Sequence, residues 1–531
     1  MAMPDQPARR GHERPAAKRA SYRLGFLFGT LNFVAVSGLG LVSTVVTARL
    51  YGVRIVGQFA LVWAPVAALW VLSTVKEQQA LIREVTALPP RHPRVSQLFA
   101  AVFTFSCALT VAVSLVVAVV CLLIYPGPLH APELVVPVLV TIAGYATVGN
   151  TGWNIDSILS AFVAGRELFF VRLHEVVAYI VIATTIGLVW RSVWGMVIAL
   201  IGGWVTSLIH RMIAVRPFVR ASLTLDEYRA GLRVLPDLLR FGLKATPGQL
   251  AQGFSQQGGI WALGVVAPVA VVGAYSRAQT IPQRLVQASN RITEVLYPTL
   301  VGRHAQGDRH GFDRALIDSI RYEVIGMLAI AAVLGGAAHS VLAIFGPGFS
   351  SATTALALLV LFPALASVTA TQTQALWATN RPGLTSVIAG VRLAITIVLL
   401  VVLTPSIGMV GPAIALLAGY LAVVALSGLA LRPSLARPLR FTWPIRERIA
   451  LLAAYAGGFA AAHGVEQLVP SIAGLLLCLP AGAAAYVAVL LLCRGLNGRD
   501  RHRLSEIIAG LRARRERREG PAVQPVSGRA V

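Results

Sequence analysis

The sequence is poor in charged residues and in residues that bind metals. Only 13% of its 531 residues are Asp, Glu, Lys or Arg, whereas a soluble protein has roughly 25%. Hydrophobic residues make up 56%, and the mean hydropathy is +0.72. These values exclude an ordinary soluble domain and predict a polytopic membrane protein. The four cysteines lie in or at the ends of apolar runs without metal-ligand spacing, so we expect neither a metal site nor a disulfide framework.

Sequence motifs for common cofactors are also missing. The chain has no P-loop, no dinucleotide-binding fingerprint and no zinc motif, so we expect no cofactor. Its net charge of +24 would suggest nucleic acid in a soluble chain. Here the charges sit in short connections between apolar runs, so they indicate membrane orientation and no nucleic-acid partner. Only three of the 46 basic residues are lysines, so arginine at any one site is weak evidence for phosphate recognition.

Apolar runs long enough to cross a membrane fill most of the chain. A spanning helix needs about 20 apolar residues. Fourteen runs reach this length, namely 22–48, 56–76, 97–124, 134–160, 168–190, 193–215, 241–266, 269–296, 320–345, 352–378, 383–404, 408–431, 447–468 and 472–494. We therefore predict an all-α membrane protein with about 14 transmembrane helices. The first run is too long for a signal peptide and is expected to be a permanent helix.

Short sequence matches recur at a nearly constant spacing. VGQFA (56–60) matches VGAYS (272–276), and GMVIALIGGW (195–204) matches GPAIALLAGY (411–420), and the offset in numbering is the same for both, 216. Two weaker matches have offsets of 215 and about 220. The offset spans six helices, which predicts two six-helix lobes related by a pseudo-two-fold axis along the membrane normal, plus two C-terminal helices.

The repeat divides the chain into predicted regions. The list is: 1–21, a disordered basic cytoplasmic tail; 22–216, the N-terminal lobe; 217–240, an amphipathic cytoplasmic linker; 241–431, the C-terminal lobe; 447–494, the two extra helices; and 495–531, a second basic cytoplasmic tail. Alternate loops carry the arginines, and both tails are basic. The positive-inside rule therefore places both termini in the cytoplasm.

A row of arginines marks the run 269–296. Arg277, Arg284 and Arg291 are seven residues apart, so they fall on one side of a helix. A charge facing lipid costs on the order of 3 kcal/mol or more, so this side should face a partner or water. We interpret the row as lining a cavity for an anionic substrate. The alternative is that the helix leaves the membrane early, so that Arg291 and also Arg284 sit in the interface.

Further candidates lie in other runs. Those for substrate binding are Gln256, Gln257, Arg392, Arg172 and Asn154, and those for ion coupling are Asp156 and Glu175. Structural explanations compete with these roles: Asp156 can pair with a nearby arginine, and Arg172 and Glu175, three residues apart, can neutralise one another. Arg49 with Gly52 and Gly57 is typical of turn chemistry at the end of the first helix. No Asp or Glu falls inside 22–48, 241–266, 352–378 or 383–404, which favours an anion carrier over a cation exporter.

Five segments, in this order and spacing, carry a resemblance to a known family. They are ARLYGVRIVGQFALV (48–62), VVGAYSRAQTI (271–281), VLYPTLVGRHAQGD (295–308), IFGPGFSSA (344–352) and PSIGMVGPAIALLAGY (405–420). The chain resembles, over about 22–430, the polysaccharide biosynthesis flippases of the multidrug, oligosaccharidyl-lipid and polysaccharide exporter superfamily. The resemblance implies a two-lobe fold of twelve core helices plus two and a cationic central cavity, with Arg277, Arg284 and Arg392 as partners of a pyrophosphate.

The resemblance also implies a function. It is the movement of an undecaprenyl-pyrophosphate-linked oligosaccharide from the cytoplasmic to the outer leaflet of a bacterial inner membrane, with a glycan polymerase or other membrane proteins of the pathway as candidate partners. A lipid II flippase of the same superfamily is the nearest alternative. A multidrug antiporter is less favoured, because the aspartate that such relatives carry in the first helix is missing and Asn32 is the nearest polar residue. A membrane glycosyltransferase or polymerase is least favoured, because the loops predicted to lie outside are short and poor in carboxylates.

Overall fold

The computed structural model describes residues 16–86, 88–220, 222–243, 246–436, 444–469 and 472–495. Side chains are described from residue 35 onward, except at 237, 240–247, 249–250, 288, 290–295 and 472 within these ranges. The predicted tail 1–21 lies mostly outside the described residues, as does 496–531.

The described chain consists of helices and their connections, without a strand. The first half contains α1 (Ala16–Leu72), α2 (Glu77–Val85), α3 (Pro93–Ile124), η1 (Pro132–Leu134), α4 (Val135–Gly144), η2 (Tyr145–Gly149), α5 (Asn150–Ala161), α6 (Gly165–Val189), α7 (Val193–Val215) and α8 (Leu225–Leu243). The second half contains α9 (Thr246–Val266), α10 (Val269–Ala305), α11 (Arg309–Gly336), α12 (Ala338–Ala343), η3 (Phe349–Ala352), α13 (Thr353–Leu359), α14 (Phe362–Ala378), α15 (Pro382–Ile407), α16 (Val410–Leu431), η4 (Arg432–Ser434), α18 (Ile445–Leu468) and α19 (Ile472–Leu492). Ten helical stretches in the described residues are long and apolar enough to cross a membrane, so the all-α membrane fold is confirmed, while the number of 14 spans stays a prediction.

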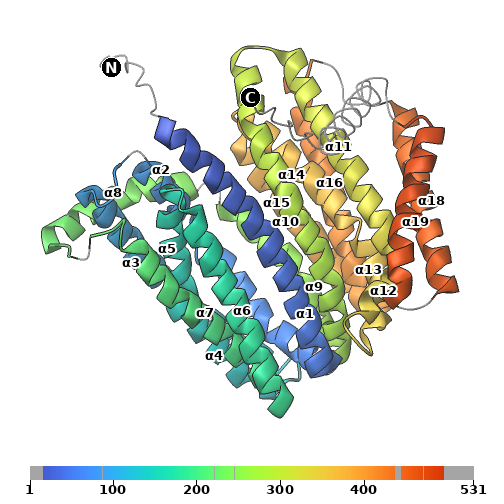
Figure 1. Ribbon diagram of the computed structural model, residues 1–531, viewed down its shortest axis with the longest axis horizontal. Coiled ribbons are helices and arrows are strands. Elements are labelled where there is room, and N and C mark those ends of the chain that lie inside the picture. Colours follow the sequence, from blue (N-terminus) through green and yellow to red (C-terminus); the bar gives the residue numbers. More distant parts are fainter. Residues whose placement is uncertain are drawn as a thin grey trace, which may run out of the picture.

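The element α1 is two helices joined by a sharp kink. Gly52 has φ 78° and ψ 167°, a conformation that only glycine adopts without strain. The chain therefore turns at Gly52, and the predicted helices 22–48 and 56–76 are the two arms of α1. We refer to the end of the bundle that contains Gly52 as the kink end. The short helix α2 and the amphipathic α8 lie at the opposite end (Figure 1).

The helices repeat along the chain as the sequence predicts. The second arm of α1 begins after Gly52 and α10 begins at Val269, and α3 and α11 begin at Pro93 and Arg309. The pairs α6 and α15, and α7 and α16, likewise begin at positions that the offset makes equivalent to within one residue. Even the interruptions agree, because a π turn separates α4 from α5 and a break at Val360–Leu361 separates α13 from α14. The chain therefore folds as two similar lobes: the N-lobe, α1–α7, and the C-lobe, α9–α16.

The lobes meet through equivalent residues. A Cβ atom added to Gly57 would collide with the carbonyl oxygen of Val269, and one added to Gly273 would collide with that of Val53. Gly57 and Gly273 are equivalent in the repeat, as are Val53 and Val269. Each lobe thus presents the same pair to the other, which is the contact that a two-fold axis generates. The two glycines let the backbones of the second arm of α1 and of α10 approach closely.

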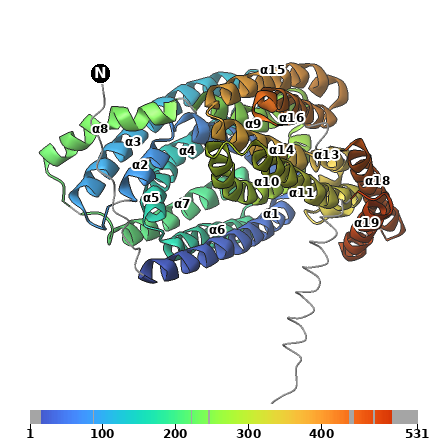
Figure 2. The same cartoon turned by 90° about the horizontal axis from the view of Figure 1, so that it is seen from above.

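The remaining helices frame this pair of lobes. Figure 1 shows α2–α8 on one side and α9–α16 on the other, with the long first arm of α1 running between them. Viewed from above in Figure 2, α18 and α19 pack on the far side of the C-lobe, where both contact α11. At the end opposite the kink, α8 packs on α3 and α2 through an apolar cluster that includes Leu81, Leu98 and Leu238.

Candidate functional site

The centre of the candidate site is Arg277, on α10 between the lobes. Its Nε atom is buried and has no hydrogen-bond partner. The guanidinium lies within electrostatic range of the Tyr179 hydroxyl on α6, and that hydroxyl interacts with the side chain of Thr47 on α1. A C-lobe arginine therefore lies near a polar group of the N-lobe.

The second arginine, Arg284, also faces the N-lobe. A Cβ atom added to Gly40 of α1 would lie 3.3 Å from its Nη2 atom, so glycine at this position leaves room for the guanidinium. Nη1 donates to Oε1 of Gln287, 3.3 Å away on the same helix. Arg284 follows Arg277 by seven residues on α10. A helix rises 1.5 Å per residue, so the two charges are spaced by about 10 Å along the interface.

Neither of these two arginines forms an ion pair in the described part of the chain. Several described carboxylates pair with other arginines: Asp156 and Glu175 with Arg172 and Arg211, and Asp308 with Arg303. A charge withdrawn from water without a counterion is costly, so it calls for a partner that arrives from outside. The side chain of Arg291, the third member of the predicted row, lies outside the described residues, as does that of Asn32.

Three glutamines lie on α9 and α10. Nε2 of Gln279 donates to the carbonyl oxygen of Gln256 across a distance of 2.6 Å, which ties α10 to α9. Oε1 of Gln257 is buried without a partner. The predicted residues Gln256 and Gln257 therefore lie on the helix next to Arg277, and Gln257 retains a free acceptor.

The structure places Arg392 inside the C-lobe, apart from Arg277. Arg392 is 4% exposed, and its guanidinium carbon lies 4.7 Å from the centre of the Tyr420 ring. The ring face attracts a cation and supplies part of the lost hydration. Nε has no hydrogen-bond partner. A role of Arg392 in substrate binding stays a prediction, and in this conformation the residue is packed between α15 and α16.

The three predicted charged residues of the N-lobe form one neutral cluster. Asp156 accepts from Arg172 at 2.7 Å and from Nε of Arg211 at 2.8 Å. Glu175 accepts from Arg211 at 3.1 Å and lies 3.5 Å from Arg172. The arrangement matches the structural alternative, in which Asp156 pairs with a nearby arginine, whereas ion coupling by Asp156 or Glu175 stays untested. Arg211 is not among the predicted site residues. Its signal in the sequence is an arginine within the apolar run 193–215, which needs a counterion.

The last predicted residue, Asn154, is 1% exposed in the same lobe. Its side-chain nitrogen donates to the Ser106 hydroxyl at 3.1 Å and to the Asn150 carbonyl oxygen at 3.1 Å. Its Oδ1 atom has no partner. Asn154 thus links α5 to α3, away from the arginines of α10. The structure places Arg277 and Arg284 against the N-lobe, and Gln256 and Gln257 on α9, which is tied to α10. Arg392 packs on Tyr420, and Asn154 forms its hydrogen bonds within the N-lobe.

Two repeated helical lobes that bury a basic pair between them define the class: a membrane transporter with the fold of the multidrug, oligosaccharidyl-lipid and polysaccharide exporter superfamily. The family described as "Polysaccharide biosynthesis protein" matches residues 25–303, which is more than half of the chain. The chain therefore belongs to this family. No curated protein sequence matches it significantly.

Solved structures with the same fold include three informative ones. The lipid II flippase MurJ in an inward closed conformation has a TM-score of 0.63 at 12% identity, covering 88% of this chain and 97% of its own. An inward-facing multidrug resistance transporter of the MATE family has a TM-score of 0.57 at 16% identity, covering 75% and 94%. A superfamily transporter from Pyrococcus furiosus, reported with a binding pocket of reverse polarity, has a TM-score of 0.53 at 17% identity, covering 79% and 96%. At these identities the likeness shows the fold alone.

Proposed function

We propose that the protein is a flippase that moves an undecaprenyl-pyrophosphate-linked oligosaccharide, a polysaccharide precursor, from the cytoplasmic to the outer leaflet of a bacterial inner membrane. The observation that carries this proposal is the basic pair Arg277 and Arg284, which lies between the lobes without an acidic partner among the described residues. Membership in the polysaccharide biosynthesis family supports the cargo.

The chemistry of the pair suits a pyrophosphate. Arginine presents a planar fork of donors that matches phosphate oxygens, and the resulting charge-assisted bonds are roughly twice as strong as neutral hydrogen bonds. Two guanidinium groups spaced by about 10 Å along the helix can bind the pyrophosphate one after the other as the cargo moves along the helix. The free acceptor of Gln257 and the hydroxyl of Tyr179 are suited to a sugar hydroxyl close to the phosphate.

The mechanism follows from the two-fold contact between the lobes. In the proposed cycle the pyrophosphate enters from the end of α2 and α8 while the lobes are joined at the kink end. The lobes then rock about their interface and expose the basic pair toward the kink end. The lipid tail stays in the bilayer beside the protein. Release requires weaker binding in the second conformation, because a ligand shifts a conformational equilibrium only through its difference in affinity for the two states.

The proposed direction of transport depends on how the protein is oriented in the membrane. The basic loops, including Arg91, Arg94, Arg216 and Arg220, gather near α2, α3 and α8, so we assign that end and both termini to the cytoplasm. The kink end then faces outward. A glycan polymerase, or another membrane protein of the pathway, is the proposed recipient of the cargo.

The test is a deletion strain in which the lipid-linked oligosaccharide of each leaflet is measured together with the surface glycan. We expect a completed intermediate to accumulate on the inner leaflet while the surface glycan is lost. If no intermediate accumulates and the external chains are only shortened or altered, the protein acts as an enzyme or after translocation, and the flippase proposal is wrong.

A lipid II flippase is the second candidate. It is favoured by the structural likeness to MurJ, which extends over 88% of this chain. Lipid II also carries a pyrophosphate, so the basic pair does not separate the two cargoes. Rescue of a strain depleted of its lipid II flippase would favour this candidate, and failure to rescue, with accumulation of another lipid-linked glycan, would favour the first.

A multidrug antiporter fits the described charges less well. Exporters of cations need a buried acid, whereas the charge between the lobes is basic, and both acids of the N-lobe cluster are neutralised by arginines. Transport assays with cationic dyes in the deletion strain would expose such an activity.

A further inference from the structure

Besides the basic pair Arg277 and Arg284, the contact between the lobes includes a further arginine, Arg49. Nε of Arg49, at the end of the first arm of α1, donates to the carbonyl oxygen of Ile344 at 2.7 Å. Among hydrogen bonds whose two partners are both described, it is the one that joins a residue of α1–α7 to a residue of α9–α16. No described ion pair crosses between the lobes either. The sequence suggests only turn chemistry for Arg49, so the cross-lobe bond is a finding of the structure.

The bond lies where the backbone on both sides is shaped for it. Arg49 stands three residues before the kink at Gly52. Ile344 begins the connection from α12 to η3, in which Gly346 and Gly348 both have positive φ, 113° and 85°. A Cβ atom added to Gly346 would lie 3.6 Å from Cγ of Arg49, so the loop passes close to the arginine. The two glycines turn the loop, and the Ile344 carbonyl is left facing α1.

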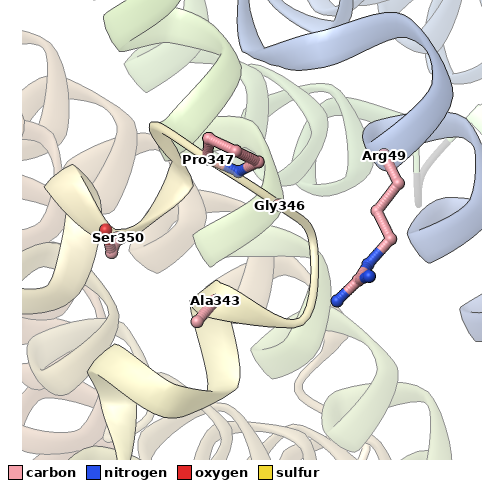
Figure 3. Close-up of a pocket in the computed structure, with 5 residues that line it drawn as sticks. All are labelled: Arg49, Ala343, Gly346, Pro347 and Ser350. Atoms are coloured by element: carbon pink, nitrogen blue, oxygen red, sulfur yellow. The ribbon is translucent and has the colours of Figure 1, made fainter. Parts of the chain in front are cut away.

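The rest of the guanidinium borders an open hollow. Arg49, Ala343, Gly346, Pro347 and Ser350 line a hollow of about 450 Å³ at this end, and Figure 3 shows the arginine reaching from α1 toward the loop. Arg49 is exposed, and no described carboxylate pairs with it. One of its nitrogen atoms therefore makes the bond, while the other two form no hydrogen bond with a described residue.

We propose that Arg49 is a latch that holds the two lobes together at the kink end. Its hydrogen bond to Ile344 must break each time that end opens. The proposal rests on transport by alternating access but not on the identity of the cargo. Opening at the kink end separates α1 from the loop at Ile344, so the bond cannot survive it. A hydrogen bond of this kind shifts a two-state equilibrium by roughly two- to tenfold. Such a bias favours the closed state and still allows the bond to break in every cycle.

The experiment measures opening of the kink end directly, as the accessibility of a cysteine to a labelling reagent, in the absence of substrate. Val53 is the reporter position, because its side chain packs on Gly348 of the opposite lobe: a Cβ atom added there would lie 3.1 Å from Cγ1 of Val53. The four native cysteines are replaced by alanine, and Val53→Cys is introduced. The purified protein in lipid nanodiscs is then reacted with a water-soluble maleimide, and the rate of labelling is measured.

Three variants are compared on this background. Arg49→Ala removes the latch, and Arg49→Gln keeps a neutral donor on a shorter side chain. Arg54→Ala is the matched control, because it removes an exposed positive charge at the same end that makes no described interaction. We expect labelling to be two- to tenfold faster in Arg49→Ala than in Arg54→Ala, with Arg49→Gln between them. Equal rates in Arg49→Ala and Arg54→Ala would overturn the latch.

A second single-cysteine variant tests whether Arg49→Ala destabilises the whole fold. It retains only native Cys121, which is 4% exposed in the core of the N-lobe. Arg49→Ala should leave its labelling unchanged, and faster labelling of Cys121 would mean that the variant unfolds and that no latch exists. Because no cargo is present, the outcome is independent of the flippase proposal, which fails separately if the deletion strain accumulates no lipid-linked intermediate.

Discussion

The second arm of α1 and the first half of α10 occupy equivalent places in the two lobes, yet they differ in charge. The constant offset of the repeat sets Leu61 against Arg277 and Ala68 against Arg284. Leu61 and Ala68 are 1% and 5% exposed. At these equivalent positions the N-lobe packs with small or apolar residues. The fold therefore does not require the arginines for packing. The difference shows that a structurally symmetric scaffold carries these two positive charges on one side, where we propose the anion site.

The other membrane-depth arginines sharpen this comparison. In the N-lobe, Arg172 and Arg211 share two carboxylates, and the four charges cancel. In the C-lobe, Arg392 on α15 lies over the ring of Tyr420, which takes the place of a counterion. These arginines within the lobes are therefore matched by groups of the protein, whereas Arg277 and Arg284 between the lobes have no counterion among the described residues.

The largest effect is expected when α10 is made to match α1. Arg277→Leu should lower transport by roughly 10- to 100-fold, because a hydrogen bond to a charged group is worth about 1.5–3 kcal/mol. Thermal stability should be retained or raised, since the variant removes a partly buried charge that has no counterion among the described residues. Export of the glycan and the melting temperature of the purified protein are the measurements. Leu61→Met is the control, and normal export by Arg277→Leu would contradict the assignment of the site.

A different outcome is expected for the neutral cluster. Asp156→Asn leaves Arg211, which is 4% exposed in its side chain, short of its nearest counterion, so the free energy of unfolding should fall by about 3 kcal/mol. Adding Arg211→Gln should restore part of the loss. Thermal unfolding of the single and double variants measures both effects. Full stability of Asp156→Asn combined with loss of transport would instead identify Asp156 as an ion-coupling residue.

The sequence predicted the helical architecture better than the surroundings of each polar residue. Hydropathy and the constant offset of the repeat were sufficient for the helices and the lobes, because both depend on local composition. The seven-residue spacing likewise predicted that Arg277 and Arg284 share a face. The sequence indicates the depth of Arg392 in the membrane but not the direction of its side chain. An arginine at that depth can face the other lobe or pack within its own, as Arg392 does against Tyr420. The cluster around Arg211 and the bond of Arg49 both join residues far apart in the chain, which no local pattern encodes.

Variants at the contact between the lobes test whether the two lobes are equivalent there. Gly57→Ala and Gly273→Ala each place a methyl group against a carbonyl oxygen of the other lobe. Overpacking of this kind costs about 1–3 kcal/mol, so both should disfavour the state closed at the kink end and to a similar extent. Labelling of Val53→Cys would report it, with Gly302→Ala as the control because nothing lies within 4 Å of that position. Strongly unequal effects of the two variants would argue against a two-fold contact.

The smallest effect concerns the equivalent caps of α3 and α11. His92 caps α3 through the Arg94 amide, and Asp308, its equivalent in the repeat, caps α11 through the Gly311 amide at 2.8 Å. The Gly311 N–H group and the Arg303 guanidinium lower the pKa of Asp308 below its usual value of 3.8. Its contribution to stability is therefore complete above pH 3.8 and is lost as the pH falls through the lower pKa of the folded state. Asp308→Asn should be slightly less stable at neutral pH, and the difference should shrink as the pH falls below the usual pKa in thermal melts. A difference that stays constant across this range would show that the cap does not depend on the charge.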